Sequence, residues 1–174
     1  MSKRKSYWNY KKIFKKYKGE HDVFVETGTH TADSVCDAID LGFTKIYSVE
    51  INKRFYDESL KKINQYYPDA IESGKVTLKL GCSRDHFPVF VNLIKDQSAM
   101  FWLDSHHGSD VPTSNELNKL IASEYKHHTI IIDDMNHHVD EHQMDLYCDT
   151  INSDYKTETF TGITPQAQKV YYVK

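Results

Sequence analysis

Short apolar runs recur along the chain, and polar or glycine-containing stretches separate them. Five of these runs are rich in β-branched or aromatic residues and have the length of buried strands. They lie at residues 23–25, 46–50, 75–80, 99–103 and 129–132. Between them, apolar residues recur at the three- and four-residue spacing that is typical of amphipathic helices. Strands that alternate with helices predict a mostly parallel sheet with both faces covered.

Two of the helical segments have recognisable starts. Thr31 and Asn52 stand where N-caps are expected, ahead of helices over about 32–41 and 53–66. Other helices are expected near residues 7–17, 87–94, 117–121 and 139–152.

The last part of the chain has a different pattern. Two strand-like runs at 156–160 and 169–173 flank turn residues and predict a C-terminal antiparallel hairpin. A chain of 174 residues without repeats or a low-complexity linker is expected to form one folded unit. The predicted fold class is therefore α/β, with a Rossmann-like, doubly wound, mostly parallel sheet, helices on both faces and this hairpin. Residues 1–20 are predicted to form a basic N-terminal helix ahead of a single domain at 21–174.

Charge is unevenly distributed along the chain. Eight of the 22 Lys and Arg residues, but one of the 25 Asp and Glu residues, lie within the first 20 positions. A basic arm on an acidic body can bind nucleic acid, but a solvated helix face is the commoner explanation, so nucleic acid is not the partner that we expect. We expect no membrane partner either, because no apolar run is long enough to span a bilayer and the N-terminus lacks the apolar stretch of a secretory signal. The three scattered cysteines have neither metal nor disulfide spacing, which favours reduced thiols and a cytoplasmic location.

The turn after the first strand is the most informative stretch. Gly28 follows the strand at residues 23–25 and precedes a helix, as in a nucleotide-binding βαβ unit. Glu50 ends the next strand about twenty residues later, where such a unit has an acid that binds ribose hydroxyls. A dinucleotide turn needs another glycine beside the pyrophosphate, but His30 occupies that position and Asp33 follows. The pattern favours an adenosine ligand without pyrophosphate, such as S-adenosylmethionine. The alternative is a plain α/β domain in which Glu50 is a solvated strand end.

Acidic residues gather at the expected carboxyl ends of the strands, which in an open parallel sheet meet at the ligand-binding edge. They are Glu26, Glu50, Asp104, Asp133 and Asp134. The last three fall on two strands that a short connection makes neighbours. Three carboxylates in one cleft repel one another unless a cation or protons intervene, and all-oxygen ligands favour Mg²⁺ or Ca²⁺. The alternative is that some of these acids only cap helices.

Two histidines follow Asp104 in the same loop. A neutral imidazole at His106 or His107 could accept a proton near neutral pH, or could bind a softer metal. Exposed loop histidines without a function are the simpler explanation for such a pair.

Motifs between about residues 23 and 136 resemble those of one enzyme family. V-E-T-G-T-H-T-A-D-S resembles an E-x-G-x-x-x-G-x-S glycine motif, in which Glu26, Gly28 and Ser34 match. Ala32 replaces the second glycine of that motif. I-Y-S-V-E-I-N resembles a ribose motif, which gives Glu50 the hydroxyl-binding role. The family is the class I S-adenosylmethionine-dependent methyltransferases, and within it the metal-dependent small-molecule O-methyltransferases of the catechol type.

Further motifs extend this resemblance to the adenine and metal sites. G-C-S-R-D is similar to the family's G-A-S-Q-D segment, which implies that Ser83 and Arg84 border adenine. F-W-L-D and I-D-D resemble the segments that hold Mg²⁺, which implies that Asp104, Asp133 and Asp134 are metal ligands. The predicted cofactor-binding residues are Glu26, Gly28, His30, Ser34, Glu50, Ser83, Arg84 and Asp104.

Two substitutions set the chain apart from that family. His107 stands where the family has a lysine base, and either it or His106 is expected to accept the hydroxyl proton. Asp134 stands where the family has an asparagine ligand, and the added negative charge favours a neutral or cationic acceptor. The chain is also similar to small sugar- and antibiotic-modifying methyltransferase-like proteins with a W-L-D-x-H element.

The expected function is methyl transfer from S-adenosylmethionine to a hydroxyl of a small molecule, with Mg²⁺ as the favoured cation. Two other functions are compatible with the same residues: a non-enzymatic metal- or nucleoside-binding Rossmann module, and nucleic-acid methylation by way of the basic arm. The chain shows neither the K-D-K-E motif of ribose methylation nor an N-P-P-Y-type motif of amine methylation. Neither the acceptor nor the oligomeric state follows from any pattern in the sequence.

Overall fold

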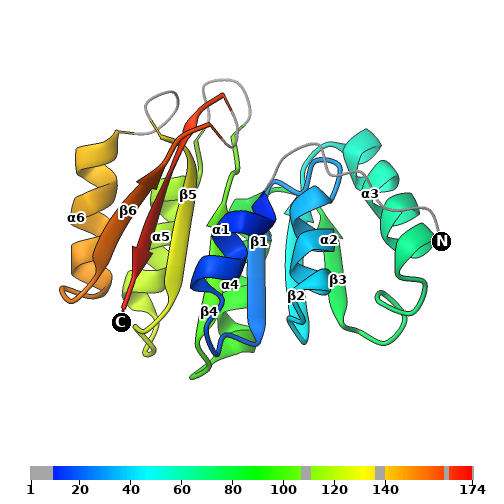
Figure 1. Cartoon of the computed structure of the whole chain (residues 1–174), viewed down its shortest axis with the longest axis horizontal. Coiled ribbons are helices and arrows are strands. Elements are labelled where there is room, and N and C mark those ends of the chain that lie inside the picture. The colour runs from blue at the N-terminus through cyan, green and yellow to red at the C-terminus, as the bar shows by residue number, and fades with distance from the viewer. Residues whose placement is uncertain (1–9, 107–110, 136–139, 163–164, 174) are drawn as a thin grey trace.

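The protein is built on one seven-stranded sheet in the order β3-β2-β1-β4-β5-β7-β6 (Figure 1). The computed structural model describes residues 10–106, 111–135, 140–162 and 165–173. The strands are β1 (Val23–Thr27), β2 (Lys45–Glu50), β3 (Val76–Leu80), β4 (Ala99–Leu103), β5 (Thr129–Met135), β6 (Lys156–Phe160) and β7 (Ala167–Tyr172). Strands β1 to β5 run parallel, whereas β7 is antiparallel to both β5 and β6. This confirms the predicted fold class, including the C-terminal hairpin.

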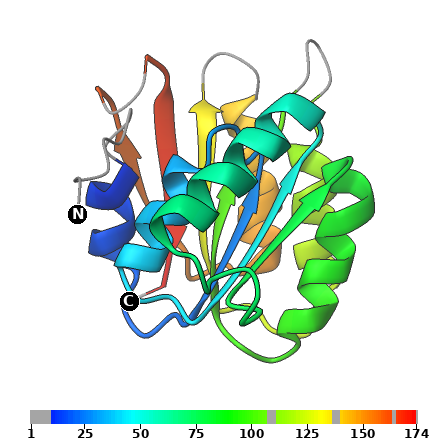
Figure 2. The same cartoon turned by 90° about the vertical axis from the view of Figure 1, so that its right-hand side faces the viewer.

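Helices cover both faces of the sheet (Figure 2). They are α1 (Tyr10–Tyr17), α2 (Asp33–Asp40), α3 (Lys53–Tyr66), α4 (Ser83–Ile94), α5 (Thr113–Ala122) and α6 (Glu141–Ile151). Buried residues of α1, α2 and α3 share one hydrophobic cluster, and those of α4, α5 and α6 share the other. None of these helices is long and apolar enough to cross a membrane.

The central strands are buried because each faces a helical layer on both sides. In β1, Phe24 belongs to the cluster under α1 and α2, while its neighbours Val23 and Val25 belong to the opposite cluster. In β4, Trp102 and Phe101 divide in the same way. Adjacent strand residues point to opposite faces, so strands covered on both sides are apolar throughout.

Helix α1 packs its apolar stripe into the core beside β1 and β4. Ile13 and Phe14 are fully buried, and the Phe14 ring lies 5.0 Å from that of Phe24 and 5.2 Å from that of Trp102, centroid to centroid. The predicted amphipathic helix is therefore present in the described part of the N-terminal segment, and its inner face belongs to the main core.

The two predicted helix caps have different outcomes. The Asn52 side chain accepts a hydrogen bond from the Arg54 amide at 3.0 Å, so it caps α3 as predicted. The prediction of Thr31 as the cap of α2 was wrong, because the helix starts after Ala32 and has no side-chain cap. His30 and Ala32 both have positive φ angles, of 48° and 57°, and this sharp turn places Thr31 outside the helix.

Candidate functional site

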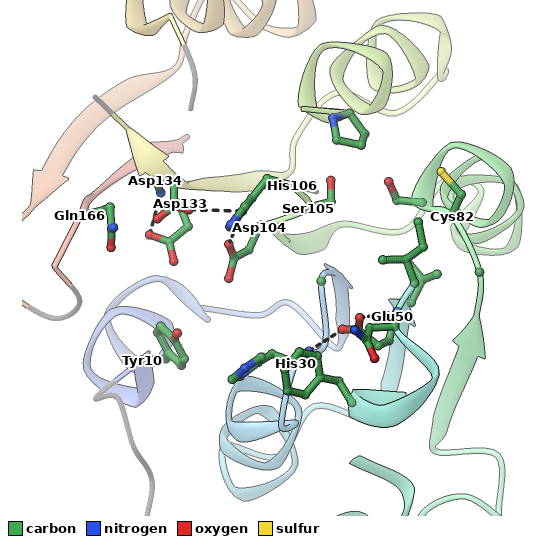
Figure 3. A pocket seen from close by; sticks show the side chains of 18 of the residues that line it. Tyr10, His30, Glu50, Cys82, Asp104, Ser105, His106, Asp133, Asp134 and Gln166 are labelled. Atoms are coloured by element: carbon green, nitrogen blue, oxygen red, sulfur yellow. Dashed lines mark hydrogen bonds and ion pairs between the residues drawn. The ribbon is translucent and has the colours of Figure 1, made fainter. Parts of the chain in front are cut away.

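A cavity of about 470 Å³ opens at the carboxyl ends of β1, β2, β4 and β5 (Figure 3). This is the edge at which open parallel sheets bind ligands. Its lining falls into two parts, one around Glu50 and the other around Asp104. The wall consists of Tyr10, Gly28, His30, Val49, Glu50, Ile51, Asn52, Phe55, Gly81, Cys82, Ser83, Asp104, Ser105, His106, Pro112, Asp133, Asp134, Pro165 and Gln166.

Gly28 lies where the two parts of the cavity meet. Its φ angle is +85°, and a Cβ at this position would lie only 2.2 Å from the Asp104 carbonyl oxygen. Its amide donates a hydrogen bond to the Val49 carbonyl at 3.0 Å. A side chain here would therefore separate the ends of β1 and β4, so glycine is required by the close approach as well as by the backbone conformation.

Beneath this turn lies a buried polar network around Glu26. Ser34 and Ser48 both donate hydrogen bonds to its carboxylate, the second at 2.6 Å. Burial raises the pKa of Glu26 to about 8, against the effect of these hydrogen bonds. The sequence predicts Glu26 and Ser34 as cofactor-binding residues, but neither lines the cavity. They lie behind its wall and hold the turn from below.

Glu50 lines the cavity at the end of β2, where the sequence predicts the ribose-binding acid. One carboxylate oxygen accepts a hydrogen bond from the His30 amide at 2.7 Å, and the other accepts one from the Asn52 amide at 2.8 Å. Each oxygen has a second lone pair that could accept a ligand hydroxyl. The carboxylate is thus fixed in direction and still able to bind.

The wall beside Glu50 is mostly apolar. Val49, Ile51, Phe55 and Cys82 contribute to it, and the Ile51 side chain is 50% exposed although it is a large hydrophobic residue. Such a surface can pack against a flat aromatic ring.

Of the two residues predicted to border adenine, Ser83 lines the cavity and Arg84 does not. Arg84 instead exerts its charge on the buried Glu116, where it favours the ionised carboxylate. The prediction that Arg84 borders a ligand is therefore not matched by its position outside the cavity lining.

The second part of the cavity contains a group of possible metal ligands. Asp104, His106 and Asp134 each offer one ligand atom, and these atoms lie within 4.8 Å of one another. His106 Nδ1 is 3.3 Å from an Asp134 oxygen and 3.8 Å from an Asp104 oxygen. Asp134 has a positive φ angle of 56°, in the stretch of β5 where the pairing register with β7 shifts. The group therefore depends on an irregular strand end.

Asp133 does not belong to this group, although the sequence predicts it as a metal ligand. One of its oxygens accepts hydrogen bonds from the Gln168 side chain at 2.7 Å and from the Asp134 amide at 2.8 Å. Of the three predicted aspartates, the structure brings Asp104 and Asp134 together with His106, and Asp133 lies beside this group. Asp133 still lines the cavity, and burial raises its pKa to about 6.

Several acids lie close together in this part of the cavity. No Lys or Arg is present among the described residues that line the cavity. Burial and the neighbouring charges of Asp133 and Asp134 raise the pKa of Asp104 well above its ordinary value. A bound cation would remove much of this repulsion.

His107, the other predicted catalytic residue, lies outside the described residues. The structure adds four residues that the sequence reading did not single out: Tyr10, Ser105, Glu116 and Gln168. Tyr10 of α1 faces the acids across the cavity (Figure 3), and burial together with these acids raises the pKa of its hydroxyl, which stays protonated. Among these four, Glu116 could have been singled out from the sequence, because it is a charged residue on the apolar face of α5 beside Leu117 and Leu120.

Comparison with known proteins identifies the fold. No protein-family model matches the sequence, and no curated protein is significantly similar to it. Among solved structures, the "putative methyltransferase yhhF" of Escherichia coli has a TM-score of 0.64 at 9% identity, over 100% of this chain and 89% of that one. The "putative caffeoyl-CoA O-methyltransferase" of Staphylococcus aureus has a TM-score of 0.65 at 10% identity, over 95% and 81%. The precorrin-6y C5,15-methyltransferase of Geobacter metallireducens GS-15 has a TM-score of 0.62 at 12% identity, over 95% and 87%.

The chain shares the Rossmann-like fold of these methyltransferase structures. Two of these neighbours are named for different substrates and one for none, and at such identities the similarity concerns the fold. In this chain the cavity has Glu50 on one side and the group formed by Asp104, His106 and Asp134 on the other.

Proposed function

We propose that this protein is an S-adenosylmethionine-dependent methyltransferase that acts on a hydroxyl of a small molecule and is assisted by a divalent cation. The main support is that a fixed, ligand-accessible carboxylate and a three-residue metal-ligand group line one cavity. When bound, S-adenosylmethionine supplies an electrophilic methyl group, and a divalent cation supplies the positive charge that acidifies a hydroxyl.

On the cofactor side, Glu50 accepts hydrogen bonds from the ribose hydroxyls through its remaining lone pairs. Ile51 and Phe55 pack against the adenine ring. Gly28 lets the ends of β1 and β4 lie close together between the cofactor side and the ion side. These roles use the remaining acceptor positions of the Glu50 carboxylate and the exposed apolar surface of Ile51.

On the ion side, Asp104, His106 and Asp134 hold the cation. An imidazole ligand beside two carboxylates suits Mn²⁺, Fe²⁺ or Zn²⁺ better than Mg²⁺, which prefers oxygen ligands. We therefore change the expected ion from Mg²⁺ to a first-row transition metal. His106 cannot accept the substrate proton at a nitrogen that binds the ion, so His107 is the proton acceptor that we propose, on the sequence alone.

The charge of the cavity restricts the acceptor. Four carboxylates line it, those of Glu50, Asp104, Asp133 and Asp134, and its described lining contains no Lys or Arg. The carboxylates of this described lining would repel an anionic acceptor more than a neutral or cationic one. We propose a neutral or cationic hydroxyl compound, with Tyr10 as a wall and hydrogen-bond donor. The same charge argues against nucleic acid, and Lys11 and Lys16 of the basic helix α1 already pair with Asp40 and Glu158.

The proposal is tested by calorimetry followed by turnover. The protein is first treated with chelator and then titrated with S-adenosylmethionine and, separately, with Mn²⁺ and Mg²⁺. We expect it to bind the cofactor, and to bind Mn²⁺ more tightly than Mg²⁺. Turnover is then measured as S-adenosylhomocysteine release. The acceptors are neutral and amino-substituted vicinal diols, and catechol, which ionises more readily to an anion, is the comparison.

Two variants and one control make the result specific. Asp134→Asn and His106→Ala should lose Mn²⁺ binding and turnover but keep cofactor affinity, whereas Asp96→Asn, at an exposed acid away from this cavity, should change none of the three. Cofactor and metal binding without turnover on any acceptor would favour the non-enzymatic binding module. Undiminished turnover in excess chelator would remove the cation from the mechanism.

A further inference from the structure

A buried carboxylate lies behind the cavity and contacts the loop that contains two of the three metal-ligand candidates. Glu116 is in the first turn of α5, is 1% exposed and does not line the cavity. One of its oxygens accepts a hydrogen bond from the Ser105 hydroxyl at 2.7 Å. The other accepts one from the Thr27 hydroxyl at 3.2 Å. Glu116 thus joins the ends of β1 and β4 through their side chains.

The position of Ser105 gives this contact its importance. Ser105 lies between Asp104 and His106, and all three line the cavity. The Asp104 amide donates a hydrogen bond to the Thr27 carbonyl at 3.1 Å, so the backbone of β1 holds the loop on one side. Glu116 holds it on the other side through Ser105. The directions of Asp104 and His106 therefore depend on an anchor at each side of the loop.

Glu116 also lies close to the cofactor side of the cavity. The hydroxyl of Ser83, the first residue of α4, is buried and makes no hydrogen bond of ordinary geometry to the described residues. It is nevertheless near enough to Glu116 to favour the ionised carboxylate, as does the charge of Arg84. One carboxylate thus meets polar groups from β1, α4 and the loop after β4.

Packing alone does not account for an acid at this position. Leu117 and Leu120 on the same face of α5 are fully buried, and a carboxylate among them is unfavourable unless it is hydrogen-bonded. An apolar residue of similar volume would fill the space without that cost. What an apolar residue could not do is accept hydrogen bonds from Ser105 and Thr27.

We propose that Glu116 is a positioning residue that, through Ser105, fixes Asp104 and His106 in the arrangement that binds a divalent cation. The inference rests on the proposed ion-binding role of Asp104 and His106. Groups that hydrogen-bond directly to a metal ligand typically change metal affinity about tenfold to a hundredfold when they are removed, and Glu116, which acts through Ser105, should lie toward the lower end.

The test measures Mn²⁺ affinity by calorimetry on the full chain, together with the thermal midpoint of each variant. Glu116→Ala and Ser105→Ala should each weaken Mn²⁺ binding by about tenfold or more. The double variant should be no weaker than Glu116→Ala alone, because both changes remove the same contact. Glu116→Gln keeps an acceptor for Ser105 and should recover part of the affinity. Glu124→Gln, an exposed glutamate just beyond α5, is the matched control and should bind as the parent does.

The outcomes separate this inference from the proposed function. If the parent binds Mn²⁺ and the folded Glu116 and Ser105 variants bind it equally well, Glu116 does not position the ligands and the ion site stands. The same conclusion follows if the losses of Mn²⁺ affinity in the two single variants add up in the double variant. Lower thermal midpoints with unchanged Mn²⁺ affinity would make Glu116 a structural residue only. If the parent binds neither Mn²⁺ nor another divalent ion, both the ion site and this role are wrong. Should Glu116→Ala fail to fold, Ser105→Ala and Glu116→Gln decide the question.

Discussion

Glu50 is fixed in direction by two backbone amides before any ligand binds. The His30 and Asn52 amides hold one carboxylate oxygen each, so the side chain does not lose much further freedom on binding. This arrangement agrees with the ribose-binding role that the sequence predicts for Glu50. At the residue scale, affinity for adenosine should depend on this side chain more than on its neighbours.

We therefore expect Glu50→Ala to weaken binding of S-adenosylmethionine. The loss of a charge-assisted acceptor should cost about 1.5–3 kcal/mol, or roughly tenfold to a hundredfold in the dissociation constant. Calorimetry measures the effect, with Glu72→Ala at an exposed site as the control. Parent-like binding by Glu50→Ala would mean that the adenosine site is elsewhere.

Glu26 predicts a pH dependence of stability. Burial raises the pKa of its carboxyl from 4.5 to about 8. The folded protein therefore keeps a proton that the unfolded chain releases above pH 4.5, so this group makes the protein less stable as the pH rises from about 4.5 to about 8. One proton corresponds to at most about 1.4 kcal/mol per pH unit.

The measurement compares urea unfolding of the parent and of Glu26→Gln at several pH values between 5 and 8. The parent should lose stability with rising pH more steeply than Glu26→Gln, because glutamine does not titrate. Glu20→Gln, at an exposed position, should follow the parent. Parallel curves for the parent and Glu26→Gln would show that Glu26 is ionised throughout this range.

At the scale of elements, α1 is basic in sequence, but its place in the fold depends on its apolar face. Its lysines face outward, but Phe14 is fully buried between Phe24 and Trp102. The helix also brings Tyr10 to the cavity wall. We infer that α1 stabilises the core and shapes the acceptor side of the cavity.

Phe14→Ala should lower the free energy of unfolding by about 3–5 kcal/mol, because it removes a fully buried ring and leaves a cavity. Denaturant titration measures this loss, and Lys15→Ala on the exposed face should change stability by less than about 0.5 kcal/mol. Equal stability of the two variants would mean that α1 does not pack as described and can detach from the sheet.

The strand β5 illustrates what a local pattern cannot predict at this scale. Its apolar residues predict an end at residue 132, but the strand continues to Met135, which pairs with Ala167 of β7 after a shift in register. That pairing joins residues that are far apart in the sequence. It also decides that Asp134, and not Asp133, points toward His106.

At the scale of the whole molecule, the cavity should bind adenosine ligands without phosphate groups more tightly than those with phosphate groups. His30 takes the place of the glycine that a dinucleotide turn needs, and the described lining has no Lys or Arg to bind a pyrophosphate. The fold is therefore compatible with nucleosides in general, but this particular site favours those without phosphate.

We expect S-adenosylhomocysteine to stabilise the protein against unfolding and NAD⁺ not to do so. A ligand at one hundred times its dissociation constant should add about 2.7 kcal/mol to the free energy of unfolding. Thermal unfolding with each ligand provides the measurement, and Glu50→Ala, which should lose the effect of S-adenosylhomocysteine, is the control. Equal stabilisation by NAD⁺ would contradict the inference that the turn containing His30 disfavours a pyrophosphate.

The sequence by itself determined the succession of helices and strands along the chain, because apolar periodicity reflects which side of each element is buried. It also located Gly28, Glu50 and Asp104, since a glycine turn and acids at strand ends follow from local pattern and the topology of parallel sheets. Asn52 was found for the same reason, as a helix cap depends only on its immediate neighbours.

Only the tertiary structure decided which side chains meet in the cavity. Gln168 lies 35 residues from Asp133 and binds it, which leaves His106 to complete the group with Asp104 and Asp134. Glu116 meets Thr27 across 89 residues of sequence. Contacts of this kind depend on strand order, on the register shift in β5 and on side-chain direction, and these are set by packing between distant segments.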